Sequence, residues 1–111
     1  MKLITKEIEK AFAKQGDTSQ KSMAEIKIVA KFFGGGACSW YLYEKLDADI
    51  YMAFVTLGDP EMAECGTVSM QELESIKFPP FGLGVERDMY FTPLSRTLED
   101  VMETVKAGGH V

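Results

Sequence analysis

The sequence predicts one α+β domain over residues 1–111, built on a mainly antiparallel sheet of about five strands whose apolar side is covered by helices. Apolar and polar side chains alternate with a period of two along several short segments, which is typical of strands. Short turns separate most of these segments, and parallel neighbours would need crossovers of a dozen residues or more. Segments with helical spacing lie at the start, in the middle and at the end of the chain.

The first predicted element is an amphipathic helix at the start of the chain. Ile8, Ala11 and Phe12 recur at helical spacing behind Thr5, a residue type that caps helix starts, and Gly16 is suited to end the helix.

Four strands are predicted next. Residues 26–33 alternate until three consecutive glycines at 34–36 end the strand. Strands over 37–46 and 50–57 follow, and the second of these is apolar on both faces. A fourth, shorter strand covers 64–68.

A short helix, a loop, a last strand and a last helix complete the prediction. Ser69 and Glu72 have the spacing of a capping box, which predicts a helix ending near residue 76. Residues 78–84 contain two prolines and two glycines and predict a loop. A fifth strand over 85–91 precedes a final helix that begins after Thr97.

Composition and charge restrict the partners. No apolar run is long enough for a membrane span and no secretion signal is evident, so we expect a cytoplasmic protein that binds no membrane. The formal net charge is −5, and the lysines gather in residues 1–31, which carry a net +3, so residues 32–111 carry −8. This balance leaves contact with nucleic acid open but does not favour it, and it leaves a protein partner possible.

Few residues can support catalysis or bind a metal. His110 is the only histidine, and Cys38 and Cys65 lack the spacing of a zinc site. We therefore expect no metal and no cofactor, and no nucleophile activated by histidine. Whether the protein is an enzyme stays open, and the missing motifs favour a non-enzymatic role.

Carboxylates are the only abundant reactive groups. We hypothesise that Asp59, Glu61, Glu64, Glu86 and Asp88 gather at one edge of the sheet, where Glu64, Glu86 and Asp88 are candidate catalytic residues that would hold Mg²⁺. The alternative interpretation, which we favour, is a solvated acidic surface.

The candidate binding residues are Arg87, Trp40, Glu61 and Phe91. By alternation Arg87 shares a face with Val85, Met89 and Phe91, and a guanidinium among apolar groups needs a carboxylate or carbonyl partner. We expect structural pairing with Glu61 or Glu64, and the alternative is a clamp for an anionic ligand.

The aromatic content allows a partner-binding patch as well as a core. The residues in question are Trp40, Tyr41, Tyr43, Phe78 and Phe81, together with seven methionines, and core packing is the expectation for Trp40.

Several parts of the chain match a known sequence pattern, namely Trp40, residues 64–73, residues 84–93 and Thr97-Leu98. The most specific part is Glu-Arg-Asp-x-x-Phe-x-Pro, which starts at Glu86. In these residues the chain resembles a family of short bacterial proteins, Domain of Unknown Function 2958. Thr67 departs from the pattern, which commonly has an aromatic there, and the glycine turn is longer. The resemblance implies a cytoplasmic bacterial protein, often carried on plasmids or other mobile elements, without an established activity. Some relatives bear the label of single-stranded DNA endonuclease.

Three hypotheses follow from the sequence. The first is a non-catalytic binding or accessory module of a mobile genetic element. The second is a metal-dependent endonuclease for single-stranded DNA that uses the carboxylates, and the third is an acidic decoy that mimics DNA.

Overall fold

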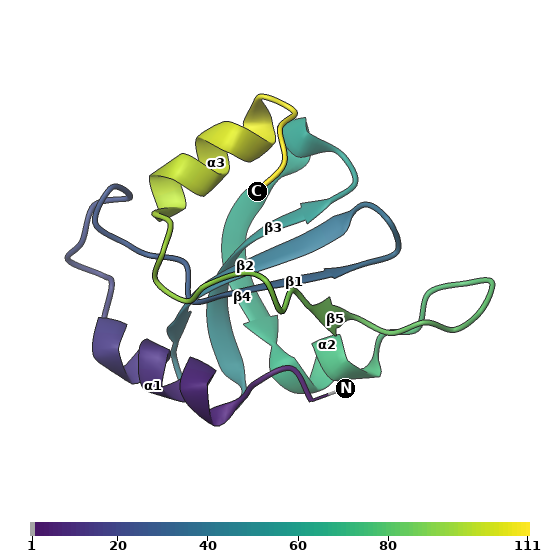
Figure 1. Cartoon of the computed structure of the whole chain (residues 1–111), viewed down its shortest axis with the longest axis horizontal. Helices are drawn as coiled ribbons and strands as arrows, with labels where there is room; N and C mark the ends of the chain where they lie inside the picture. The colour runs from purple at the N-terminus through teal and green to yellow at the C-terminus, as the bar shows by residue number, and fades with distance from the viewer. Residues whose placement is uncertain (1) are drawn as a thin grey trace.

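The computed structural model describes residues 2–111 and has the predicted α+β architecture: a five-stranded antiparallel sheet with helices packed against it (Figure 1). The strands lie in the order β4-β3-β2-β1-β5, so β4 and β5 form the two edges. The elements are α1 (Lys6–Gln15), β1 (Ala30–Gly34), β2 (Cys38–Lys45), β3 (Ile50–Leu57), the 3₁₀ turn η1 (Pro60–Met62), β4 (Glu64–Ser69), α2 (Met70–Ser75), β5 (Glu86–Arg87) and α3 (Leu98–Lys106).

The caps predicted for the three helices are confirmed. The hydroxyl oxygen of Thr5 accepts a hydrogen bond from the amide of Ile8, and Ser69 and Thr97 cap α2 and α3 in the same way. Each cap satisfies an amide that has no partner inside its helix, and this fixes where the helix begins.

Helices cover both faces of the sheet, whereas the sequence suggested a single apolar side. Trp40 and Leu42 of β2 pack towards α1 and α2, while Tyr41 and Tyr43 pack towards α3. β2 is central and buried on both faces, so its side chains are apolar or aromatic at consecutive positions rather than at every second one.

The first strand is shorter than predicted because its alternation breaks. Ile28 packs with the α3 side, but Val29 and Ala30 both belong to the α1 side. Residues 26–28 pair instead with the chain that leads into α3, where the amide of Leu94 donates to Ile28 O and the amide of Leu98 donates to Ile26 O.

The predicted fifth strand, residues 85–91, is also wrong in extent, since β5 has only two residues. The carboxylate of Asp88 accepts from the amide of Tyr90, and the amide of Phe91 donates to Asp88 O. These bonds form a turn that ends pairing with β1, so Phe91 packs on the α3 side and does not share a face with Val85 and Arg87.

Residues 78–84 form the predicted loop, which projects from the molecule (Figure 1). The amide of Phe78 donates to Leu83 O, and Phe81 at the tip is 84% exposed. Phe78 is half-buried and anchors the loop.

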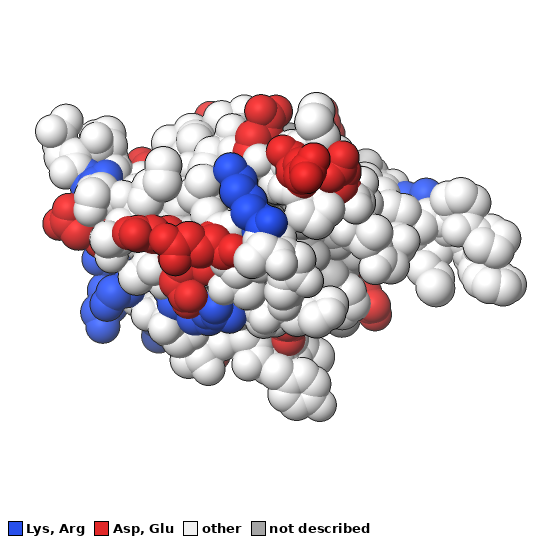
Figure 2. Space-filling view, turned by 90° about the horizontal axis from the view of Figure 1, so that it is seen from above, with Lys and Arg blue, Asp and Glu red and all other residues white. Residues whose placement is uncertain are grey.

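Charged side chains of both signs are interspersed on the surface. Figure 2, which views the molecule from the top of Figure 1, shows acidic clusters separated by lysine or arginine side chains. No helix within residues 2–111 combines the length and the apolar character needed to cross a bilayer.

Candidate functional site

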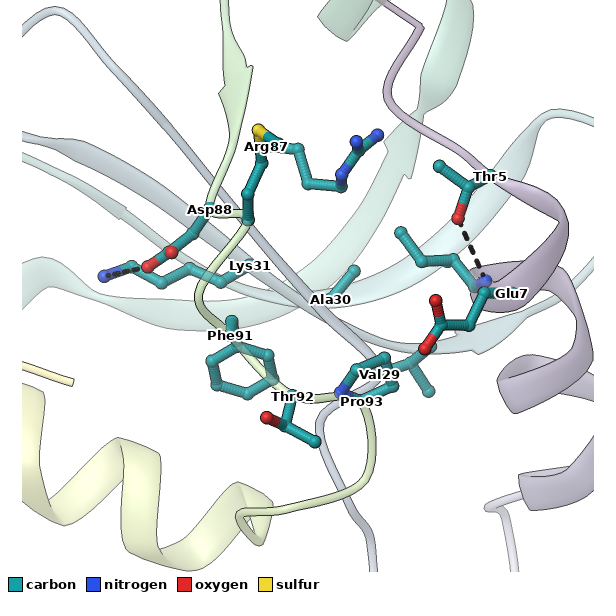
Figure 3. A pocket seen from close by; sticks show the side chains of 12 residues that line it. Thr5, Glu7, Val29, Ala30, Lys31, Arg87, Asp88, Phe91, Thr92 and Pro93 are labelled. Atoms are coloured by element: carbon teal, nitrogen blue, oxygen red, sulfur yellow. Dashed lines mark hydrogen bonds and ion pairs between the residues drawn. The ribbon is translucent and has the colours of Figure 1, made fainter.

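A hollow of about 290 Å³ lies between the start of α1, strand β1 and residues 87–93 (Figure 3). Its size is near the lower limit for a small-ligand site. The turn at Asp88 creates it: the amide of Asp88 still donates to Lys31 O, the chain then leaves β1, and it returns where Leu94 bonds to Ile28. Residues 89–93 therefore arch away from the sheet.

Arg87 is held in this hollow by backbone carbonyls. Its Nη1 donates to Lys2 O at 3.0 Å and to Leu3 O at 3.4 Å. The expected pairing with Glu61 or Glu64 is wrong, because those residues lie at the β4 side of the sheet, and Arg87 forms no ion pair within residues 2–111. The guanidinium has five N–H donors, and within residues 2–111 only Nη1 is hydrogen-bonded, so the other nitrogens can donate to a further acceptor.

Lys31 and Asp88 neutralise each other on the other side of the hollow. Lys31 Nζ lies 3.5 Å from Asp88 Oδ2 and donates to Val111 O at 3.3 Å. The same ammonium lies 5.9 Å from the centre of the Tyr41 ring. Burial raises the pKa of Tyr41, so its phenol is neutral at ordinary pH.

Glu7 supplies a second charge without an ion-pair partner in the described part of the chain. It lies in the first turn of α1, and Figure 3 shows its carboxylate directed into the hollow. Phe91 and Pro93 form an apolar wall beside it. The hollow thus offers donors at Arg87, an acceptor at Glu7 and an apolar surface, which suits binding of a polar group that carries an apolar part.

Comparison with known proteins identifies the family. A family model described as a protein of unknown function (DUF2958) matches residues 3–111. The chain belongs to the DUF2958 family. No curated protein and no solved structure matches it. In this DUF2958 protein, residues 87–93 lie within the segment that carries the resemblance, and they form one wall of the hollow.

We hypothesised that the candidate carboxylates of this DUF2958 protein gather at one edge of the sheet, and this hypothesis is wrong. Glu64 lies on β4 and Glu86 on β5, at opposite edges with three strands between them. Asp59 and Glu61 lie in or beside η1, near the start of β4, and Asp88 bonds with Lys31. Within residues 2–111, no three His, Cys, Asp or Glu side chains are grouped to hold a metal ion.

The aromatic candidates divide into buried and exposed residues. Trp40, Tyr41 and Tyr43 are buried in the two cores, so their side chains do not form a surface patch. Phe91 is half-buried at the hollow, and Tyr90 beside it is exposed.

Sequence reasoning missed Glu7 and Lys31 as residues of the hollow. Both read as members of a solvated lysine-rich and glutamate-rich segment, and no local pattern connects residue 7 with residue 93. The one usable signal was Asp88 itself, because an aspartate side chain often accepts a hydrogen bond from the backbone amide two positions later.

Proposed function

We propose that this DUF2958 protein is a non-catalytic binding or accessory module, and that the hollow beside Arg87 receives an anionic or carbonyl-bearing group of its partner. The observation that supports this proposal is that the Arg87 guanidinium is fixed by two backbone carbonyls and has no carboxylate to neutralise it within residues 2–111. A charge already held in position loses little side-chain entropy when it binds.

The composition of the hollow supports binding rather than acid–base catalysis. Of its charged residues, Lys31 and Asp88 are already paired, which leaves Arg87 and Glu7 to contact a partner. Hydrogen bonds from a guanidinium to a carboxylate or phosphate are about twice as strong as those between neutral groups. The role in the cytoplasm of a bacterium, as an accessory to a mobile element, is the part of the proposal that rests on the family resemblance alone.

A pull-down from the native host with three versions of the protein tests the proposal. The wild type and Arg96→Gln should recover the same protein or nucleic acid, whereas Arg87→Gln should recover about 10- to 100-fold less, the loss expected for one charged hydrogen bond. Arg96 is the matched control because its guanidinium binds Asp100, away from the hollow. Urea unfolding of all three versions establishes that each is folded.

Two results contradict this proposal. One is recovery of no partner by the wild type, and the other is equal recovery by Arg87→Gln and Arg96→Gln.

The endonuclease hypothesis has less support from the arrangement. Its carboxylates would have to converge on one metal site, and Glu64 and Glu86 lie on opposite edges. We expect no cleavage of labelled single-stranded DNA in Mg²⁺ or Mn²⁺ above the level of a Glu86→Gln control. Cleavage above that level would contradict the proposed binding module and support the endonuclease hypothesis.

The decoy hypothesis needs a continuous acidic surface that mimics DNA. Basic side chains separate the acidic clusters on the face that Figure 2 shows. Competition with duplex DNA for a basic partner at low salt tests it, and we expect no competition.

A further inference from the structure

Strand β4 has an open edge. It pairs with β3 in continuous register from Val55–Glu64 to Ile50–Ser69. The amide of Met70 donates to Asp49 O at 2.9 Å. This bond shows which residues of β4 direct their backbone groups towards β3. Since residues of an antiparallel pair alternate between bonded and non-bonded positions, the backbone groups of Cys65 and Thr67 point away from β3. No hydrogen bond within residues 2–111 uses them.

This edge lacks the features that usually protect an edge strand. Natural sheets protect edges with lysine, proline, bulges or very short strands. β4 has six residues without lysine, proline or a bulge, and its one charge is Glu64 at the first position. The other edge, β5, has only two residues and ends at the Asp88 turn. Of the two edges, β4 is therefore the one that can pair with an added strand.

The surroundings of β4 are acidic. Residues 46–76, which include β3, η1, β4 and α2, contain no lysine or arginine. The acidic residues in this range are Asp47, Asp49, Asp59, Glu61, Glu64, Glu72 and Glu74. Glu61 and Glu64 are exposed and form no ion pair within residues 2–111. A basic partner is the one whose charge matches this side of the molecule.

An apolar hollow lies at the start of the same edge. It measures about 200 Å³, and Val55, Leu57 and Met62 line it together with the carboxylates of Asp59 and Glu64. Leu57 is 69% exposed and Met62 is 76% exposed. An apolar side chain of an added strand can be buried here, and basic side chains of the same strand would be attracted by the carboxylates of Asp59, Glu61 and Glu64.

We propose that the open edge of β4 binds an extended, lysine- or arginine-containing segment of a partner protein by strand addition. Backbone hydrogen bonds to Cys65 and Thr67 would give affinity, and the hollow and the carboxylates would give specificity, as in other strand-addition complexes. This surface lies on the edge opposite Arg87, so the inference does not rest on the proposed function of the first hollow.

The probe is a short peptide of about six residues that alternates valine and lysine and has blocked ends. Binding is measured by NMR and by amide hydrogen exchange. We expect exchange at the amides of Cys65 and Thr67 to slow by about 10-fold or more at saturating peptide, because these amides would become hydrogen-bonded. The same peptide with glutamate in place of lysine should have no effect.

Charge variants test the specificity. Glu61→Gln and Glu64→Gln should each weaken binding by about two- to fivefold at low salt, as expected for exposed ion pairs. Glu99→Gln on α3 is the matched control and should change nothing. Arg87→Gln should also leave peptide binding intact, which separates this proposal from the first.

Backbone variants test the mode of binding. Thr67→Pro removes an outward amide without removing a bond to β3, so the protein should fold and lose the peptide. A peptide with N-methyl groups on alternate residues keeps its charge but lacks the donors for a strand ladder, and it should not bind. If Thr67→Pro does not fold, this peptide still tests whether binding needs backbone hydrogen bonds.

Three results would overturn the proposal. They are equal binding of the glutamate or N-methyl peptide, peptide-induced changes that map away from β4, and protection of Cys65 and Thr67 that rises with protein concentration alone. The last result, with a dimer in sedimentation, would identify the occupant of the edge as a second copy of the chain.

Discussion

The ring of Phe78 lies directly over Gly34, and a Cβ atom on that glycine would be 2.4 Å from Phe78 Cε2. The same ring covers Gly35, which has a φ of +62°. The projecting loop is therefore joined to the β1–β2 turn by one aromatic contact, and the glycines leave the space that the ring needs.

We predict that Gly34→Ala destabilises the protein by about 1–2 kcal/mol, since overpacking forces a side chain or the backbone to shift. Phe78 is only half-buried, so the ring can move partly aside, and this keeps the cost near the lower end. The measurement is urea unfolding, with the free energy extrapolated to water.

Two further variants control for other effects of the alanine. Gly66→Ala meets no atom within 4 Å and should leave stability unchanged or slightly higher. In a Phe78→Ala background the cost of Gly34→Ala should disappear. If the cost is the same in both backgrounds, the contact with Phe78 is not its cause.

Arg87 also has a structural role that can be separated from binding. Arg87→Met keeps the apolar stem and removes the hydrogen bonds to Lys2 O and Leu3 O. We expect a loss of about 1–2 kcal/mol in the free energy of unfolding, since each such bond is worth about 1 kcal/mol. Leu3 stays fully buried and holds the start of the chain in place.

The comparison for Arg87→Met is Arg96→Met, which removes the ion pair with Asp100 and the hydrogen bond to Thr104 Oγ1 and should cost about 1 kcal/mol or less. An unfolded Arg87→Met would mean that the guanidinium is essential to the core. No change at all would mean that the two carbonyl contacts contribute nothing.

Local features of the fold were predictable because their causes are local. Thr5, Ser69 and Thr97 each cap a helix with a side chain that acts within three residues of its own position. The hairpin turn between β2 and β3 is equally local, as Asp47 accepts from the amides of Asp49 and Ile50.

One error had a local cause. Residues 85–91 alternate like a strand, yet pairing stops where the Asp88 carboxylate accepts a hydrogen bond from the amide of Tyr90. The other errors arose where distant contacts decide the outcome. The order of strands along the sheet depends on which strand adds beside β1, and nothing near Arg87 or Glu64 reveals that they lie at opposite edges. A site composed of residues from both ends of the chain, such as Glu7 and Pro93, has no sequence signature at all.

Two carboxylates should make the stability of the protein depend on pH in acid. The hydrogen bond and charge of Arg96 lower the pKa of Asp100 from its ordinary value of 3.8, and backbone amides lower the pKa of Asp47 from the same value. Because the folded-state pKa is the lower one, these carboxylates stabilise the fold above pH 3.8, and their contribution is lost as the pH falls through the folded-state value.

Thermal unfolding from pH 7 to about pH 2 measures this loss. The difference in melting temperature between the wild type and Asp100→Asn should be present at neutral pH and vanish at the acid end, and 1 M salt should reduce it at neutral pH. A difference that persists at the acid end would have another origin than the ionised carboxylate.

Two adjacent phenylalanines test the assignment of the sheet faces. Phe32 of β1 is 0% exposed in the α1-side core, whereas Phe33 points to the other face and is 38% exposed. Phe32→Ala should cost about 3–5 kcal/mol, the transfer and cavity cost of a buried ring, and Phe33→Ala about 1 kcal/mol or less. Since a domain of this size has about 5–15 kcal/mol of stability, the first variant should be marginal and the second well folded, as urea unfolding would measure. Equal costs would mean that β1 is shifted by one residue, which would also move Lys31 away from Asp88.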